Sequence, residues 1–354
     1  MLFDGAAIAA VSGLAGGLVL GLAARLGRVC GMGAVEDAIY GDDTRRLRML
    51  GLAAATAIAL TALLTAAELI EPEATRFLSQ GWSPAGAVFG GLIFGYGMAL
   101  VGTCGFGALA RTGGGDLRAA LTVSVIAVTA GATLNGPLAP IRLGLVGSES
   151  HAAATSSLAD QLDRSLGIGP LFAALAIAAA LATVCLAGGR RSAGGALGLT
   201  QTAWALAIGA VVALAWTATT LAGRIGFDQV PPENFSFIAP LSETLGLVMR
   251  GDWPDFLDFS VAAVIGVALG GAVGALLAAE FRWEACDDAR ELRRQIAGAA
   301  LMGVGGVFAG GCTIGQGLSA LSLLSVSAPL VILAIFAGAR LGLYVLVERS
   351  ASAS

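Results

Sequence analysis

The stretch that decides the fold is "GVFAGGCTIGQGLSA", residues 306–320, which places Cys312 in a glycine-dense, uncharged run. A buried cysteine alone usually fills space as a small hydrophobe. Here Gly310 and Gly311 precede the cysteine directly, and glycine permits sharp backbone turns that other residues resist. Irregular backbone at membrane depth is tolerated only where it is buried in protein or lines a cavity. The stretch therefore predicts a break that lines a pore, with the cysteine at the break.

The composition of the whole chain indicates an integral membrane protein. The 354 residues are 56% hydrophobic and only 12% charged, with a mean hydropathy of +0.84, whereas soluble domains carry about 25% charged residues. The five cysteines include no CxxC pair and there is one histidine, so no zinc site, dithiol motif or haem is indicated. We expect no metal and no cofactor, and the absence of a basic patch argues against a nucleic-acid partner.

Runs of about 20 apolar residues predict the membrane spans. The fold class we expect is an all-α polytopic membrane protein with about nine transmembrane helices, the first of them a retained span rather than a signal peptide. The predicted spans are 5–24, 49–70, 86–109, 119–137, 169–187, 200–221, 259–279, 297–322 and 327–347.

The distribution of arginine predicts the orientation of the chain. All 20 basic residues are arginine; fourteen fall in one set of predicted loops and five in the opposite set. Cytoplasmic loops are enriched in basic residues. We therefore expect the N-terminus outside and the C-terminus in the cytoplasm.

An internal repeat relates two segments of the chain. "GYGMALVGTCGFG" at 95–107 and "GVGGVFAGGCTIG" at 303–315 share the pattern GxGxxxxGxCxxG at a shift of 208, which aligns Cys104 with Cys312. A weaker match between 13–21 and 266–274 would set Cys30 opposite Trp283. Internal repeats that meet near the bilayer midplane are typical of transporters.

These matches predict a single membrane domain, 1–354, with two pseudo-symmetric repeats. The first repeat is 1–137 and carries the Cys30 and Cys104 motifs, the segment 138–258 connects, and 259–354 carries the Cys312 motif. If every span crossed fully, the Cys104 and Cys312 segments would run in opposite directions. Broken or re-entrant half-helices would remove that conflict.

Three motifs, "GRVCGMGAVEDA", "GTCGFGALARTGGG" and "GGCTIGQGLSA", resemble those of the YeeE/YedE family of bacterial membrane proteins, also called the sulphur transport domain family. The resemblance covers most of the chain, and the third motif is the most specific. It implies an hourglass-shaped helical protein of the inner membrane that transports thiosulfate, or a closely related reduced sulfur anion. It also implies that three central cysteines hand the anion across, and they map to Cys30, Cys104 and Cys312. A cytoplasmic sulfurtransferase or sulfur carrier is the partner that the family implies.

Neutral thiols suit a soft sulfur anion, because an S–H group is a weak donor that holds the anion without trapping it. Backbone N–H groups freed at the glycine breaks would supply positive potential. Thr313 and Gln316 are candidates for further hydrogen bonds, and Arg28 either attracts the anion or marks the cytoplasmic interface. The predicted substrate path comprises Cys30, Cys104, Cys312, Gly310, Gly311, Thr313, Gln316, Thr103 and Arg28.

Four alternatives stay open. A thiolate could carry the sulfur as a persulfide instead of donating a hydrogen bond. The substrate could be another sulfur- or selenium-containing compound. The protein could also be a membrane thiol oxidoreductase, although such a protein would want a dithiol motif, or a channel for an unrelated solute with cysteines that only pack.

Overall fold

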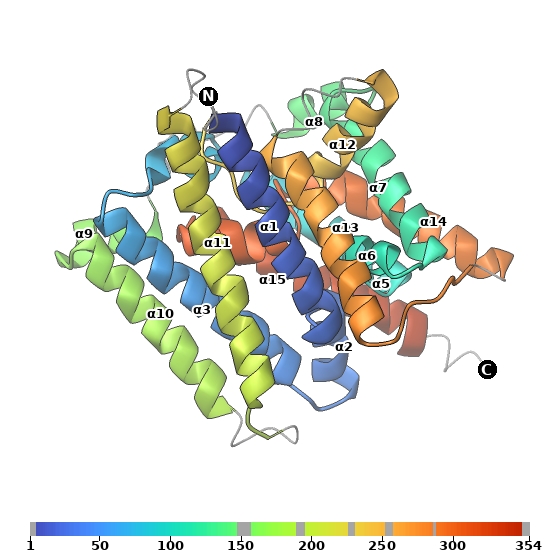
Figure 1. Ribbon diagram of the computed structural model, residues 1–354, viewed down its shortest axis with the longest axis horizontal. Coiled ribbons are helices and arrows are strands. Elements are labelled where there is room, and N and C mark those ends of the chain that lie inside the picture. The colour runs from blue at the N-terminus through green and yellow to red at the C-terminus, as the bar shows by residue number, and fades with distance from the viewer. Residues whose placement is uncertain are drawn as a thin grey trace.

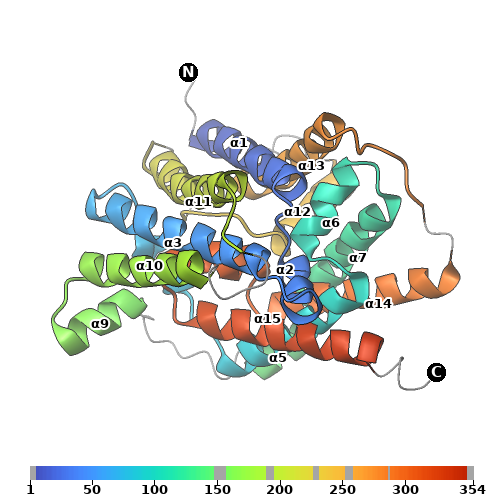
Figure 2. The same cartoon turned by 90° about the horizontal axis from the view of Figure 1, so that it is seen from below.

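The computed structural model describes residues 5–146, 157–188, 195–225, 231–251, 258–285 and 288–348, and every regular element in these ranges is helical (Figure 1). The helices form one bundle in which long, tilted helices surround several short ones (Figure 2). The helices are α1 (Gly5–Leu26), α2 (Gly31–Tyr40), α3 (Arg45–Ala66), α4 (Arg76–Ser79), α5 (Pro84–Val101), α6 (Gly105–Gly113), α7 (Leu117–Leu134), α8 (Ala139–Val146), α9 (Leu158–Leu166), α10 (Pro170–Ala187), α11 (Leu199–Ile225), α12 (Ala239–Arg250), α13 (Phe259–Leu277), α14 (Ala289–Phe308) and α15 (Ser327–Leu343), with a 3-10 turn η1 (Pro72–Ala74) and two π-helical segments, η5 (Gly315–Ala320) and η6 (Tyr344–Glu348).

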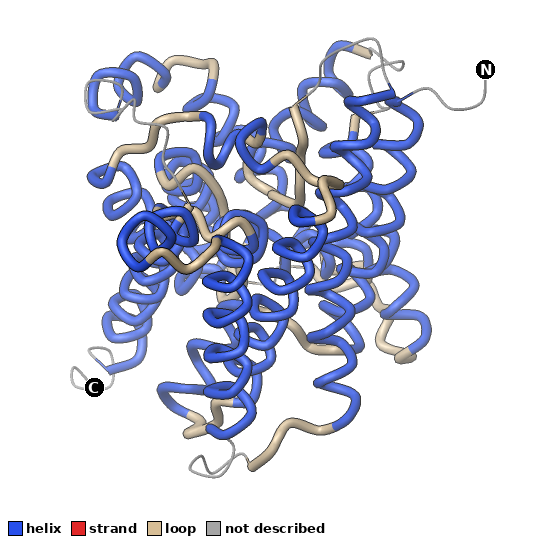
Figure 3. Tube along the Cα trace, turned by 90° about the vertical axis from the view of Figure 1, so that its left-hand side faces the viewer, coloured by secondary structure: helices blue, strands red, loops and turns tan. Residues whose placement is uncertain are grey.

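Eight helical segments within the described residues are long and apolar enough to cross a membrane. They confirm an all-α polytopic membrane protein and match eight of the nine predicted spans. The ninth, 297–322, is wrong as a continuous span, because α14 ends at Phe308 and a second helix starts at 313. The predicted span 86–109 is likewise divided into α5 and α6. Tan breaks within the blue tube mark such interruptions in Figure 3.

Glycines set the distance between the central helices. On α1, a Cβ atom at Gly13, Gly17 or Gly21 would lie 2.4 Å or less from a backbone carbonyl oxygen of α13. The two helices are therefore in backbone contact, which is how small residues stabilise helix pairs in membranes. The contacts advance together along both chains, from Gly13 beside Phe259 to Gly21 beside Val267, so α1 and α13 run parallel.

Helix α5 lies between α14 and α15. It is antiparallel to α14 and parallel to α15. Gly90 contacts Ala309 of α14 while Gly97 contacts Gly298, so α5 and α14 are antiparallel. Gly91 and Gly95 contact α15 in increasing order, so α5 and α15 are parallel. The two cysteine motifs thus do run in opposite directions, and the half-helices that we expected to remove this conflict do not remove it.

The shift of 208 residues extends beyond the cysteine motifs. It aligns α5 with α14, α6 with the helix 313–322, and α7 with α15. It also aligns Cys30, the N-cap of α2, with Ile238, the N-cap of α12. Trp283 lies on a loop with 73% of its surface exposed, whereas Cys30 is packed against the core. The structure therefore favours Ile238 over Trp283 as the counterpart of Cys30.

The bundle has two opposite faces, which we name by the course of α1. The N-terminal face is where α1 begins; Arg224 pairs with Glu71 there, and α8 and α12 lie toward it (Figure 1). The opposite face is where α1 ends, and Arg118 pairs there with Glu284 and Glu291. Arg25, Arg111, Arg118 and Arg282, which the sequence assigned to one set of loops, lie on this opposite face.

Candidate functional site

Each of the three predicted cysteines stands at the N-terminus of a short helix. Cys30 precedes α2 and Cys104 precedes α6, each in extended backbone conformation as the N-cap residue. Cys312 precedes the helix 313–322, whose middle is η5. The free backbone N–H groups of a helix N-terminus attract negative charge. We call these three residues and the backbone breaks that carry them the cysteine centre.

The Cys104 thiol lies deepest in the first half of the cysteine centre. It is 1% exposed, and its sulfur accepts a hydrogen bond from the Gly107 backbone N–H at 3.4 Å. A Cβ atom at Gly107 would lie 3.6 Å from the Cys30 sulfur and 3.7 Å from the Cys104 sulfur, so the two thiols flank the same glycine. The Thr103 hydroxyl is 3.8 Å from the Cys30 sulfur. The structure thus brings Cys30, Cys104 and Thr103 together.

Cys312 repeats the arrangement in the second half of the centre. It is fully buried, and its sulfur accepts a hydrogen bond from the Gly315 N–H at 3.4 Å. The break before it turns at Gly310, whose φ of +70° lies in the left-handed region that favours glycine. Gly102, its partner at the shift of 208, has φ +81° and closes α5 in the same way. The two breaks therefore have the same cause.

The polar residues around Cys312 differ in their roles. Gln316 donates through Nε2 to the carbonyl oxygens of Ala309 and Gly310, at 3.3 and 3.1 Å, so it holds the end of α14 rather than offering these bonds to an anion. Its buried Oε1 atom accepts no hydrogen bond from the described residues. Thr313 lies beside Cys104 and against Gly31, and its hydroxyl is buried. Thr313 thus links the two halves of the centre.

Arg28 and Gly311 complete the predicted residues. Arg28 has φ +53° and its side chain is exposed near the end of α1, so the structure does not bring it to the thiols. Gly311 lies at the break and contacts the Gln316 side chain. Of the predicted path residues, Arg28 is the one that lies apart from the cysteine centre.

A fourth segment, 234–238, reaches the centre, although no sequence pattern indicated it. Phe237 is fully buried and packs on Phe106 of α6 with ring centroids 5.4 Å apart. Ser236 contacts Gly315, where an added Cβ would lie 2.9 Å from its Oγ. Asn234 holds the segment by donating to the Val212 carbonyl at 2.8 Å and accepting from the Phe235 N–H at 2.7 Å. The segment carries neither cysteine nor glycine, so it matches none of the cysteine motifs.

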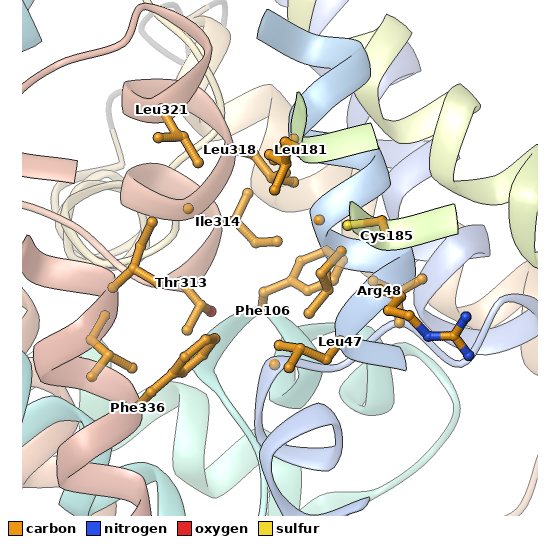
Figure 4. Close-up of a pocket in the computed structure, with 18 of the residues that line it drawn as sticks. Leu47, Arg48, Phe106, Leu181, Cys185, Thr313, Ile314, Leu318, Leu321 and Phe336 are labelled. Atoms are coloured by element: carbon orange, nitrogen blue, oxygen red, sulfur yellow. The ribbon is translucent and has the colours of Figure 1, made fainter. Parts of the chain in front are cut away.

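An apolar cavity near the centre does not suit an anion. It has a volume of about 370 Å³ and is lined by Thr313, Ile314 and Phe106 together with leucines, Cys185 and Phe336 (Figure 4). The Arg48 guanidinium at its rim points away from the space and hydrogen-bonds Thr44 and Gly195 (Figure 4). An anion in such an apolar space would lose its hydration without replacement. An anion would therefore have to reach the cysteines by another route.

Two polar cavities lie toward the two faces. The one on the opposite face has about 380 Å³ and is lined by Arg25, Arg111, Arg282 and acidic partners. The Arg25 Nε atom in it is buried and forms no hydrogen bond with the described residues. A small one toward the N-terminal face, about 30 Å³, contains Ser236 and Glu233. It adjoins the cysteine centre, because Ser236 contacts Gly315.

Comparisons with known proteins agree with this architecture. A family model described as sulphur transport matches residues 26–341. The chain is 29% identical to the thiosulfate transporter TsuA of Escherichia coli (strain K12) over 324 residues, which cover 87% of this chain and 86% of that protein. It is 25% identical to the thiosulfate transporter TsuA of Spirochaeta thermophila over 332 residues, which cover 89% and 92%. The chain therefore belongs to the sulphur transport (YeeE/YedE) family.

Proposed function

We propose that this protein is a transporter, not an enzyme, and that it carries thiosulfate across the bacterial inner membrane. The observation that carries the proposal is that three thiols stand at helix N-termini inside a membrane bundle. Two of them flank Gly107, and the third precedes Thr313, which lies against Gly31. Two relatives that are named thiosulfate transporters match most of the chain. A membrane protein of this family needs the lipid bilayer and a sulfur-containing substrate as its partners.

The chemistry of the centre fits the two ends of thiosulfate. In Cys104 and Cys312 the sulfur accepts a backbone N–H, which leaves the S–H hydrogen free to donate elsewhere. That S–H group suits the soft terminal sulfur of the anion. The positive ends of the short helices suit the sulfonate oxygens. We propose that Cys30, Cys104, Cys312, Thr103 and Thr313 line the path, with Gly310, Gly311 and Gln316 shaping it.

We infer that the thiols act by hydrogen bonding rather than as persulfide carriers. The interactions found for Cys312 are with backbone groups, and those for Cys104 are with a backbone N–H, Cys30 and Thr313. None of these neighbours is a base that would activate a thiol for attack. A related sulfur or selenium compound remains the alternative substrate, and transport of it would use the same contacts.

We further propose the orientation and the repeat that organise this path. The N-terminal face is the exterior, because the opposite face gathers the arginine-rich loops. The helix bounds favour a second repeat that starts near α11 rather than at 259, since the shift of 208 already relates α2 to α12. A sulfurtransferase or sulfur carrier would then collect the anion at the cytoplasmic face.

The test is uptake of radiolabelled thiosulfate by cells that lack other sulfate and thiosulfate importers. Wild type would be compared with Cys312→Ala at matched membrane abundance. Cys185→Ala is the control, because Cys185 is a buried cysteine inside the regular helix α10, packed against Gly51. We expect uptake by wild type and by the control, and a loss of uptake in Cys312→Ala.

Uptake that survives in Cys312→Ala would contradict the role of the thiol while leaving the substrate in place. Absence of uptake in wild type would contradict thiosulfate as the substrate. Cys312→Ser separates the two mechanisms further, because a hydroxyl keeps the size and the donor but cannot form a persulfide. Residual transport by that variant would support hydrogen bonding.

A further inference from the structure

A carboxyl group stands beside the cysteine centre on the side of the N-terminal face. Glu233 lines the small cavity there together with Ser236, Ser260 and Arg76. Ser236 contacts Gly315, and the Gly315 N–H is bonded to the Cys312 sulfur. Two contacts thus separate the cavity from the thiol. We therefore take this cavity as the mouth of the proposed path on the N-terminal face.

The Glu233 carboxyl is fixed in this mouth. Ser260 donates to its Oε2 atom at 2.9 Å, and Thr219 donates to its backbone carbonyl at 2.9 Å. The next residue, Asn234, is anchored to α11. Within the described residues no arginine forms an ion pair with Glu233. The carboxyl therefore stays in the mouth with its charge uncompensated by direct contact.

The charged groups around Glu233 come from three elements. Asp258 stands at the start of α13, Glu243 lies on α12, and Arg76 lies on α4. Three carboxyl groups thus face one guanidinium. Burial first, and then the charges of Asp258 and Glu243, raise the pKa of Glu233 to about 7, while Arg76 acts in the opposite direction. The mouth gains or loses one negative charge near neutral pH.

We propose that Glu233 is a proton-controlled gate, which admits the anion to the cysteine centre when its carboxyl is protonated and rejects it when ionised. This inference rests on the proposed function. The mouth has a volume of about 30 Å³, about the space of one water molecule, so thiosulfate must widen it and pass in contact with Glu233. An ionised carboxylate repels the dianion at that contact, whereas a protonated carboxyl donates a hydrogen bond to it.

The experiment measures thiosulfate uptake into sealed vesicles with the N-terminal face outward, at fixed internal pH. Thiosulfate stays a dianion between pH 6 and pH 8, so the substrate does not change. For a group with a pKa of about 7, the protonated fraction falls about tenfold between these values. We expect wild-type uptake to fall by about the same factor. Glu233→Gln, which keeps an acceptor for Ser260, should transport equally at both pH values.

Two neighbours provide matched variants outside the predicted path. Asp258→Asn removes a charge that raises the pKa of Glu233, so the midpoint of the uptake profile should move to lower pH. Arg76→Gln removes a charge that lowers it, so the midpoint should move to higher pH. A group elsewhere in the protein would not respond to both changes in this way.

The outcomes separate the gate from the proposed function. Wild-type uptake that is equal at pH 6 and pH 8 overturns the gate and leaves thiosulfate transport standing. A Glu233→Gln variant that is abundant in the membrane but inactive at both pH values also overturns it, as does one that keeps the wild-type pH profile. Absence of wild-type uptake at every pH instead overturns the function on which the gate rests.

Discussion

At the scale of single residues, backbone context distinguishes a cysteine at a helix break from a cysteine that packs. Cys185 and Cys312 are both buried. Cys185 lies inside the regular helix α10 with Gly51 against its sulfur. Cys312 follows a left-handed glycine and accepts a backbone N–H. The glycine frame in the sequence predicted this difference, because only a broken backbone offers free N–H groups.

Gly107 is the residue whose side chain would most directly disturb the thiols. A Cβ atom there would lie 2.4 Å from the Thr103 hydroxyl, and both the Cys30 and Cys104 sulfurs are within 3.7 Å. We expect Gly107→Ala to displace Thr103 and to reduce thiosulfate uptake roughly a hundredfold, as small displacements in a site can. Gly105→Ala is the control, because its Cβ would make only ordinary contacts at 3.6 and 3.8 Å. Equal loss in both variants would contradict this assignment.

The residues that the sequence did not reveal are those without a distinctive frame. Glu233 lies in a predicted exterior loop, where an acidic residue is usually solvated, and its burial against Ser260 depends on α13. Ser236 reaches Gly315 only because the segment 234–238 folds back into the bundle. These contacts join residues 27 positions apart for Glu233 and Ser260, and 79 apart for Ser236 and Gly315, and no local pattern encodes them.

At the scale of elements, the breaks between α5 and α6 and after α14 shape the cysteine centre. Gly102 adopts φ +81°, with open space where a Cβ would stand. Gly102→Ala should therefore lower the free energy of unfolding by about 1 kcal/mol through backbone strain alone. Gly317→Ala, which also meets open space but lies in a helical segment and has no positive φ, should raise it slightly, because alanine favours a helix over glycine. Thermal unfolding in detergent measures both, and equal effects would argue against strain at the break.

The positions of the helices were easier to predict than their interruptions. Hydropathy located eight segments, but the window from 297 to 322 stays apolar across the break at 309–312. The charged start of α14, with Arg290 to Arg294, also belongs to the helix and lies outside the predicted span. Gly310 and Gly311 indicated a break in this apolar run, but neither they nor the hydropathy predicted the separate helix 313–322 that follows it. The division of the chain into repeats stays a prediction.

At the scale of the whole molecule, the arginine bias makes the orientation testable. Glu73 is exposed on the N-terminal face and Arg290 on the opposite face. In a background without Cys286, which lies outside the described residues, we expect a membrane-impermeant thiol reagent on spheroplasts to label Glu73→Cys and not Arg290→Cys. Labelling of Arg290→Cys alone would reverse the orientation and move the Glu233 gate to the cytoplasmic side.

The relative direction of the two cysteine motifs and the counterpart of Cys30 could not be predicted from the sequence. The repeated cysteine motif was visible, but its opposite sense became clear only from the contacts of Gly90 and Gly97 with α14. The sequence also set Cys30 against Trp283, whereas the element bounds set it against Ile238. The glycine runs 13–21 and 266–274 lie on the parallel helices α1 and α13. Their similar spacing alone does not show that these two helices are counterparts in the repeat. The hourglass shape stays a prediction.

The antiparallel motifs have a kinetic consequence. An anion approaching Cys312 from one side and an anion approaching Cys104 from the other meet the same grouping, a thiol on a helix N-terminus behind a left-handed glycine. Such a centre has no intrinsic rectification, and detailed balance assigns the direction of net flux to the concentration gradient of the dianion together with the membrane potential. Cells that stop consuming thiosulfate would lose it again through the same protein, so continued metabolism, rather than the transporter, makes accumulation one-way.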